Sequence, residues 1–122
     1  MEKLGVHLVL EKMDLTRKAR LVADGHKTSG PIRSTYAKVV SHESVCIAFK
    51  YATLNDLNVW AAGIQNAYLT APTSEGFYIV CGAEFRSESI GKKAIVKRAL
   101  YGTKSAGQDF RNHLRHCMDH MD

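Results

Sequence analysis

Residues 59–72 read VWAAGIQNAYLTAP, and this stretch decides how the rest of the chain is interpreted. Its first half is apolar. Gly63 interrupts the apolar run, and the polar residue Gln65 and the turn-forming residue Asn66 follow. Such a run predicts a buried strand over residues 57–62 that ends in an exposed polar turn. Because exposed turns on a rigid scaffold often carry function, we expect the functional residues near position 63.

A β-hairpin is predicted near the N-terminus. Residues 6–11 and 17–23 are rich in β-forming side chains, and residues 12–16 between them have turn character. Lys18 and Arg20 are two residues apart in the second strand, so their side chains share one face. This row of cations is typical of a solvated strand edge, and alternatively of a surface that contacts phosphates.

Two helices are predicted, over residues 41–55 and 108–120. Ser41 is placed as the N-cap of the first helix, and Glu43 adds negative charge to its first turn. Apolar side chains at helical spacing predict one buried stripe along this helix. The stripe consists of Val45, Ala48, Phe49, Ala52 and Thr53.

Two further strands are predicted, over residues 77–81 and 94–100, from their aromatic and β-branched content. We expect both to pair with the strand at 57–62, and we expect both helices to pack on one face of that sheet. The predicted fold class is therefore α+β.

Size and charge narrow the class of protein. The 122 residues correspond to one domain, and Lys plus Arg outnumber Asp plus Glu by 17 to 12, a net charge of +5 that favours a polyanionic partner such as nucleic acid. The three cysteines are widely spaced, so we expect reduced thiols. The apolar runs are too short for a signal peptide or a membrane span, which predicts a cytoplasmic or nuclear protein that is not secreted.

Four segments, in order along the chain, resemble motifs of copia-type LTR-retrotransposon reverse transcriptases. They read KARLVADG at 18–25, TYAKVVS at 35–41, GIQNAYL at 63–69 and RALYGTKSAG at 98–107. The resemblance implies one reverse-transcriptase domain fragment over residues 1–122, with part of the fingers in about residues 1–40 and the first half of the palm in about 41–122. It also implies an antiparallel sheet with helices on one face, truncated before the family's aspartate-aspartate hairpin.

The resemblance assigns roles to particular residues. Gly63 stands where the family has an aspartate that helps to hold two Mg²⁺ ions, and glycine has no ligand side chain. Tyr68 corresponds to the aromatic residue beneath the incoming sugar, although on its own it reads as a half-buried core tyrosine. Lys18 and Arg20 correspond to contacts of the fingers with the triphosphate, and which of them faces the nucleotide stays open. Lys104 corresponds to a contact near nucleotide and template.

The parent reaction implied by the resemblance is RNA-templated addition of deoxynucleotides to a primer. Its partners are the template-primer, deoxynucleotides, Mg²⁺ and the remainder of the pol polyprotein. Because Gly63 cannot bind a metal, we expect this chain to be inactive by itself, with no intact catalytic residue and no specific metal. The alternative is a non-enzymatic, basic nucleic-acid-binding module or a degenerate retroelement relic.

One face of the C-terminal helix carries four possible soft-metal ligands. They fall at positions i, i+3, i+4 and i+7 and are His113, His116, Cys117 and His120. A structural zinc site needs a closed tetrahedral shell, and we identify no second cluster to complete it. The sequence therefore favours a solvated helix face and no metal site.

Overall fold

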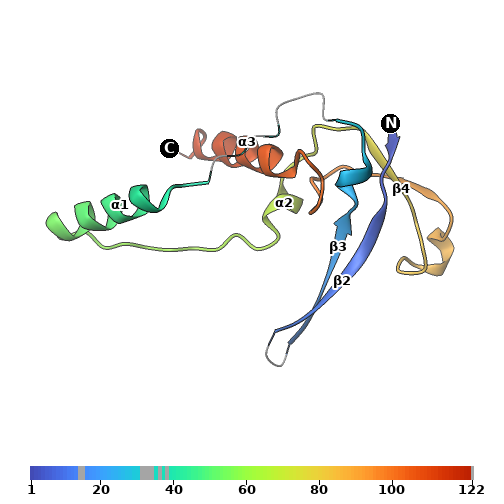
Figure 1. The fold of residues 1–122 in the computed structure, drawn as a ribbon, viewed down its shortest axis with the longest axis horizontal. Coiled ribbons are helices and arrows are strands. Elements are labelled where there is room, and N and C mark those ends of the chain that lie inside the picture. The colour runs from blue at the N-terminus through green and yellow to red at the C-terminus, as the bar shows by residue number, and fades with distance from the viewer. Residues whose placement is uncertain (14–15, 31–34, 36, 38, 122) are drawn as a thin grey trace.

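The computed structural model describes residues 1–13, 16–30, 35, 37 and 39–121. Within them the protein is α+β, with one antiparallel hairpin, one small mixed sheet and three α-helices (Figure 1). The strands are β1 (Glu2–Lys3), β2 (Val6–Met13), β3 (Thr16–Ala23), β4 (Phe77–Val80) and β5 (Lys93–Ile95). The helices are α1 (His42–Leu54), α2 (Ala67–Thr70) and α3 (Ala106–Met118), with short 3₁₀ turns η1 (Gly25–Lys27) and η2 (Ser87–Ser89).

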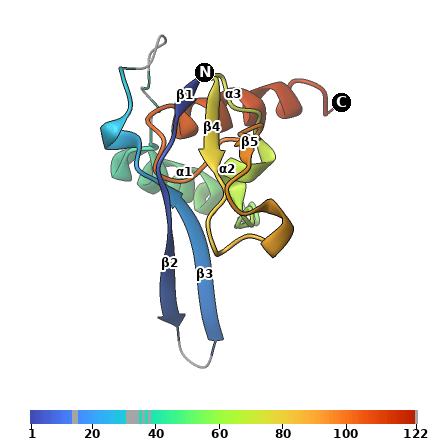
Figure 2. The same cartoon turned by 90° about the vertical axis from the view of Figure 1, so that its right-hand side faces the viewer.

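The predicted N-terminal hairpin is confirmed. β2 and β3 pair antiparallel from Val6 opposite Ala23 to Met13 opposite Thr16, so both strands run farther than predicted. The ladder projects below the small sheet as a two-stranded ribbon (Figure 2). Residues 14–15 of the predicted turn lie outside the described part of the chain.

The small sheet has β4 at its centre, with β1 parallel to it on one side and β5 antiparallel on the other. The predicted strand at 77–81 is confirmed as β4. The predicted strand at 94–100 is confirmed only in its first part, because regular pairing ends at Ile95 and a single bridge, Pro72 to Arg98, follows. Leu4, which is 1% exposed, packs with Phe77 and Ile79 in the core cluster beside this sheet.

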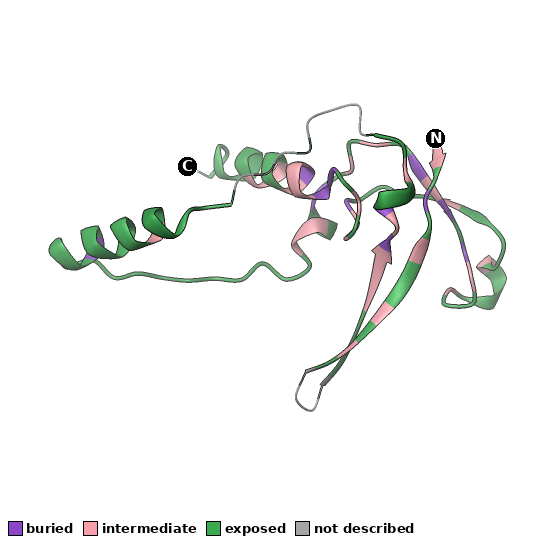
Figure 3. Cartoon of the chain, in the orientation of Figure 1, coloured by how far each residue is buried: buried purple, intermediate pink, exposed green. Residues whose placement is uncertain are grey.

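The prediction of a central strand at residues 57–62 is wrong. These residues form exposed chain between α1 and α2, and Trp60 is 93% exposed (Figure 3). No backbone hydrogen bond joins residues 58–62 to any described residue. A strand needs a neighbour for its N–H and C=O groups, and β4, its expected neighbour, is already bonded on both sides. Apolar composition alone therefore did not make a strand here.

The first predicted helix is confirmed as α1, but its predicted burial is wrong. Ser41 caps it as expected, because its Oγ accepts a hydrogen bond from the Ser44 N–H at 3.2 Å. Ala52 is the one buried residue of the predicted stripe. Val45 is half-buried, and Phe49 is 53% exposed. A capped helix forms from local interactions, whereas burial requires a partner surface. α1 stands apart from both sheets in Figure 1, so the two helices do not share a sheet face.

The second predicted helix is confirmed as α3, which begins two residues earlier than expected, at Ala106. It packs against α2 through a small cluster in which Ala71, Ala99 and Ala106 are buried. Tyr68 of α2 and Phe110 of α3 lie against this cluster, with ring centroids 6.0 Å apart. The α2–α3 pair therefore fixes the turn that follows Gly63 onto the body of the protein.

Candidate functional site

A surface depression lies where three of the four motif segments singled out in the sequence meet. Its volume is about 360 Å³. We call it the β3–α2 groove, and its lining residues are Ala19, Arg20, Leu21, Asn66, Leu69, Leu100 and Tyr101. They come from the segments at 18–25, 63–69 and 98–107, which are distant in sequence. The remaining segment is 35–41, and its residues 36 and 38 lie outside the described part of the chain.

Backbone contacts hold two walls of the groove together. The Ala23 N–H donates to the Tyr101 carbonyl oxygen at 2.7 Å, which ties the end of β3 to the turn after Leu100. Gly102 continues this turn with φ +93°, a conformation that glycine adopts without strain. A Cβ at Gly102 would overlap the Ala23 carbonyl oxygen. Glycine is therefore needed here for both its conformation and its size.

The third wall is the turn into α2. Asn66 has φ +51° and ψ +40°, the left-handed conformation that asparagine tolerates better than most residues. This confirms the interpretation of Asn66 as a turn former. Tyr68 is half-buried, its ring centroid 4.9 Å from that of Tyr101, so it supports the groove wall from behind. That position fits the core-tyrosine interpretation of Tyr68.

The predicted cationic residues are separated by the fold. Arg20 lines the β3–α2 groove, where its guanidinium lies 3.4 Å from the Glu11 carboxylate. Lys18 lies nearer the hairpin end and lines a different depression, with Leu10 and Lys12. Lys104 is also outside the groove, because its Nζ donates to the Thr28 carbonyl oxygen at 2.8 Å. Of the three cations, Arg20 is the one that reaches the groove.

Gly63 lies in the exposed segment before α2. A Cβ built there meets no atom within 4 Å, so an aspartate would fit without a clash. Within the described residues, no group of three or more His, Cys, Asp and Glu side chains is arranged to hold a metal ion. The strand that was expected to present residue 63 is not formed, so the position does not face a sheet edge.

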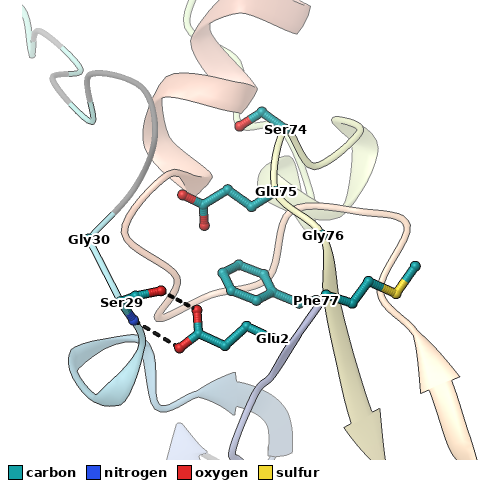
Figure 4. A pocket seen from close by; sticks show the side chains of 8 residues that line it. Glu2, Ser29, Gly30, Ser74, Glu75, Gly76 and Phe77 are labelled. Atoms are coloured by element: carbon teal, nitrogen blue, oxygen red, sulfur yellow. Dashed lines mark hydrogen bonds between the residues drawn. The ribbon is translucent and has the colours of Figure 1, made fainter.

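A second depression contains carboxylates that the sequence did not point to (Figure 4). Its volume is about 280 Å³, and Glu2 and Glu75 line it on either side of the Phe77 ring. The Glu2 carboxylate accepts hydrogen bonds from Ser29 Oγ at 2.6 Å and Ser29 N–H at 2.9 Å, and these lower the pKa of Glu2. Residues 2, 29 and 75 share no sequence pattern that could have identified this group.

Glu75 is the carboxylate of this group whose pKa is raised. Partial burial raises its pKa, and the nearby charges of Asp109 and Glu2 raise it further. Asp109 is itself buried, and its carboxylate accepts a hydrogen bond from the Ser74 N–H at 3.1 Å. The fold therefore binds a proton at Glu75 more readily than the unfolded chain does.

Glu75→Gln is expected to stabilise the protein at neutral pH. A raised folded-state pKa means that Glu75 contributes less stability as pH rises above the ordinary glutamate value of 4.5, because its ionised form is disfavoured in the fold. The neutral amide of Gln removes this penalty. The gain in the free energy of unfolding should disappear below pH 4.5, where Glu75 is protonated in both the folded and the unfolded protein. Urea denaturation between pH 3.5 and 8 measures it, with Glu88→Gln, an exposed glutamate, as control. A gain independent of pH would contradict the interpretation.

Two global properties complete the description. Across the described ranges, no helix combines the length and apolar character needed to cross a membrane. All three cysteines are free, as predicted, with Cys46 and Cys117 exposed and Cys81 buried.

In comparisons with known proteins, no family model, no curated protein and no solved structure matches this chain.

Proposed function

We propose that this chain derives from the fingers and first half of the palm of a copia-type reverse transcriptase, and that it has lost polymerisation while keeping a phosphate-binding groove. The supporting observation is the β3–α2 groove, which gathers Arg20, Asn66 and Tyr101 from three separate segments with motif resemblance. Segments of one binding site must meet in space, and these three do.

The loss of polymerisation follows from the chemistry of the parent reaction. Two divalent ions must be held a few ångströms apart by several carboxylates to clamp the attacking and leaving oxygens. Gly63 supplies no ligand at the position where the family has one. The parent enzyme, and not this chain, would therefore act on the template-primer and deoxynucleotides with Mg²⁺ and the rest of the pol polyprotein. The protein itself is proposed to reside in the cytoplasm or nucleus.

Phosphate binding in the groove would rest on Arg20. Its guanidinium presents several N–H donors in a plane that suits phosphate oxygens, and its side chain is 39% exposed. Glu11 competes for the same donors at 3.4 Å, so a phosphate must displace this ion pair. An exposed ion pair contributes only about 0–1 kcal/mol, and its exchange for a multiply charged phosphate costs little.

The alternative function is a non-enzymatic, basic module that binds nucleic acid along the hairpin. The favouring observation is that exposed cations lie on β2 and β3 outside the groove, namely Lys12, Arg17 and Lys18. Such a surface contacts backbone phosphates without reading bases. It predicts affinity for long polyanions and none for a single nucleotide.

A combined activity and binding experiment tests the proposal. We expect no Mg²⁺-dependent primer extension on an RNA template from this chain or from Gly63→Asp, because one restored carboxylate cannot organise two ions. We expect deoxynucleoside triphosphate to bind, measured by calorimetry, and Arg20→Gln to weaken it by about tenfold, the loss of roughly one charge-assisted contact.

Lys104→Gln provides the matched control, because Lys104 is an exposed cation that lies outside the groove. Equal weakening by the Lys104 and Arg20 variants would show that the groove is not the site. Primer extension by the unaltered chain would overturn the inactive interpretation. Binding of long RNA without binding of triphosphate would favour the basic-module alternative.

A further inference from the structure

Two helices each carry a histidine and a cysteine in contact. In α1 the His42 Nε2 and Cys46 Sγ atoms are 3.5 Å apart, and in α3 the His113 Nε2 and Cys117 Sγ atoms are 3.7 Å apart. Both pairs have i, i+4 spacing, which places them on one helix face. Both cysteines are exposed, so each pair is open to solvent.

The spacing within each pair matches that of two ligands on one zinc ion. Zn–S bonds of about 2.3 Å and Zn–N bonds of about 2.0–2.1 Å at a tetrahedral angle separate sulfur from nitrogen by about 3.6 Å. The observed separations fall on either side of this value. A thiol–imidazole hydrogen bond holds the same spacing without the ion, so zinc would replace the shared proton with little side-chain movement.

Each pair supplies only half of a tetrahedral shell. Among the described residues, no third histidine, cysteine or carboxylate is placed to join either pair in a metal-binding group. α1 and α3 lie apart in Figure 1, and among the described residues no group of three or more possible ligands gathers, so the two pairs do not meet within one chain in this conformation. Closure of a four-ligand site requires a second pair from elsewhere.

We propose that two copies of this chain close two identical Zn²⁺ sites, each built from the α1 pair of one copy and the α3 pair of the other. The ligands of each ion are then two imidazole nitrogens and two thiolates, a common structural zinc shell. The exchange is reciprocal, so a two-fold axis relates the copies and every ligand finds a partner. Each thiol loses its proton as the ion binds, and the proton passes to solvent.

The apolar surface around α1 supports this choice of occupant. Exposed large apolar side chains continue from α1 into the segment that follows it, namely Ile47, Phe49, Tyr51, Leu54, Leu57, Val59 and Trp60. The number of such side chains within residues 47–60 favours an interaction site over ordinary surface. A second copy docked at α1 would cover side chains that the body of its own chain leaves exposed.

A zinc-closed dimer does not depend on the proposed function. In the sequence, the cluster on residues 113–120 favoured a solvated helix face, because no second group completed its shell. The structure supplies the second pair on α1, because the i, i+4 spacing there is realised with the ring nitrogen and the sulfur in contact.

Cobalt substitution of the reduced, full-length chain tests the proposal. Co²⁺ in a tetrahedral site with two thiolates gives intense d–d bands and a thiolate charge-transfer band. We expect one Co²⁺ per chain, and a dimer in sedimentation that becomes monomeric when a chelator removes the ion. Zn²⁺ should displace Co²⁺ and keep the dimer, because zinc binds such sites more tightly.

Variants identify the ligands. Cys46→Ala and Cys117→Ala are each expected to lose the charge-transfer band and the dimer, because each removes a ligand from every site. Cys81→Ala, at the buried cysteine, and His26→Ala, at an exposed histidine outside both helices, should keep both. A full cobalt spectrum in either ligand variant would overturn the mixed α1–α3 site.

Mixing the two ligand variants separates an intermolecular site from an intramolecular one. Cys46→Ala keeps an intact α3 pair, and Cys117→Ala keeps an intact α1 pair, so a mixed dimer has one complete site. We expect the mixture to regain cobalt binding at one ion per two chains. No recovery on mixing, or a loaded protein that sediments as a monomer, would overturn the shared site.

Discussion

Gly102→Ala is expected to lower the free energy of unfolding by roughly 3–5 kcal/mol, the sum of backbone strain at positive φ and steric overlap. Gly102 has φ +93°, and a Cβ there would overlap the Ala23 carbonyl oxygen, a backbone atom that cannot rotate away. The clash lies beside the hydrogen bond from Ala23 to Tyr101, so the substitution should also open the β3–α2 groove. Urea denaturation followed by circular dichroism measures the loss.

Two other glycines separate the strain from the overlap. Gly91 has φ +78° with no atom within 4 Å of a Cβ, so Gly91→Ala should cost only the conformational strain, about 1–2 kcal/mol. Gly63 has neither restriction, so Gly63→Ala should change stability by less than about 0.5 kcal/mol. Equal losses at residues 102 and 91 would show that contact with β3 contributes nothing.

Removing two hairpin cations is expected to weaken nucleic-acid binding by about 25-fold at 0.1 M salt. Each phosphate contact on a single strand releases about 0.7 counterion, so Lys18→Ala with Arg20→Ala should reduce log affinity by about 1.4 at this salt and the salt slope by about 1.4. Both side chains lie on one face of β3. Fluorescence titration of labelled single-stranded RNA from 0.05 to 0.3 M salt measures both quantities.

The control for this experiment removes the same charge elsewhere. Lys92 and Lys97 are exposed cations outside the hairpin, and their double alanine variant lowers the net charge equally. A smaller loss in the control supports the hairpin as the contact surface. Binding that discriminates strongly between RNA sequences, or that is unchanged at high salt, would contradict a phosphate-based interface.

The elements that the sequence predicted correctly are those set by near neighbours. The hairpin follows from two β-rich runs around a short turn, and its strands bond to each other without help from the rest of the chain. α1 follows from the Ser41 cap and a run of helix-compatible residues, and Ser41 bonds to Ser44 as expected. Both are local devices, and their partners lie within a few residues or across one turn.

The incorrect predictions concerned elements whose state depends on a distant partner. Residues 57–62 have the composition of a buried strand, yet β4 is bonded on both sides by β1 and β5. β1 comprises two residues, too few for a sequence pattern to predict, and it pairs with β4 along one side. The apolar stripe of α1 predicted burial, whereas Ala52 is its one buried member in the described structure.

The candidate site divides in the same way. The sequence alone determined the residue types available: a glycine at position 63, cations in the second strand of the hairpin, an asparagine in the turn after residue 63 and a helix with histidine and cysteine at i, i+4. The tertiary structure decided which of them meet. It placed Arg20 in the groove and Lys104 elsewhere, and it gathered Glu2 and Glu75 around Phe77. Side-chain chemistry is fixed by the residue, whereas proximity between distant segments depends on the packing of the whole chain.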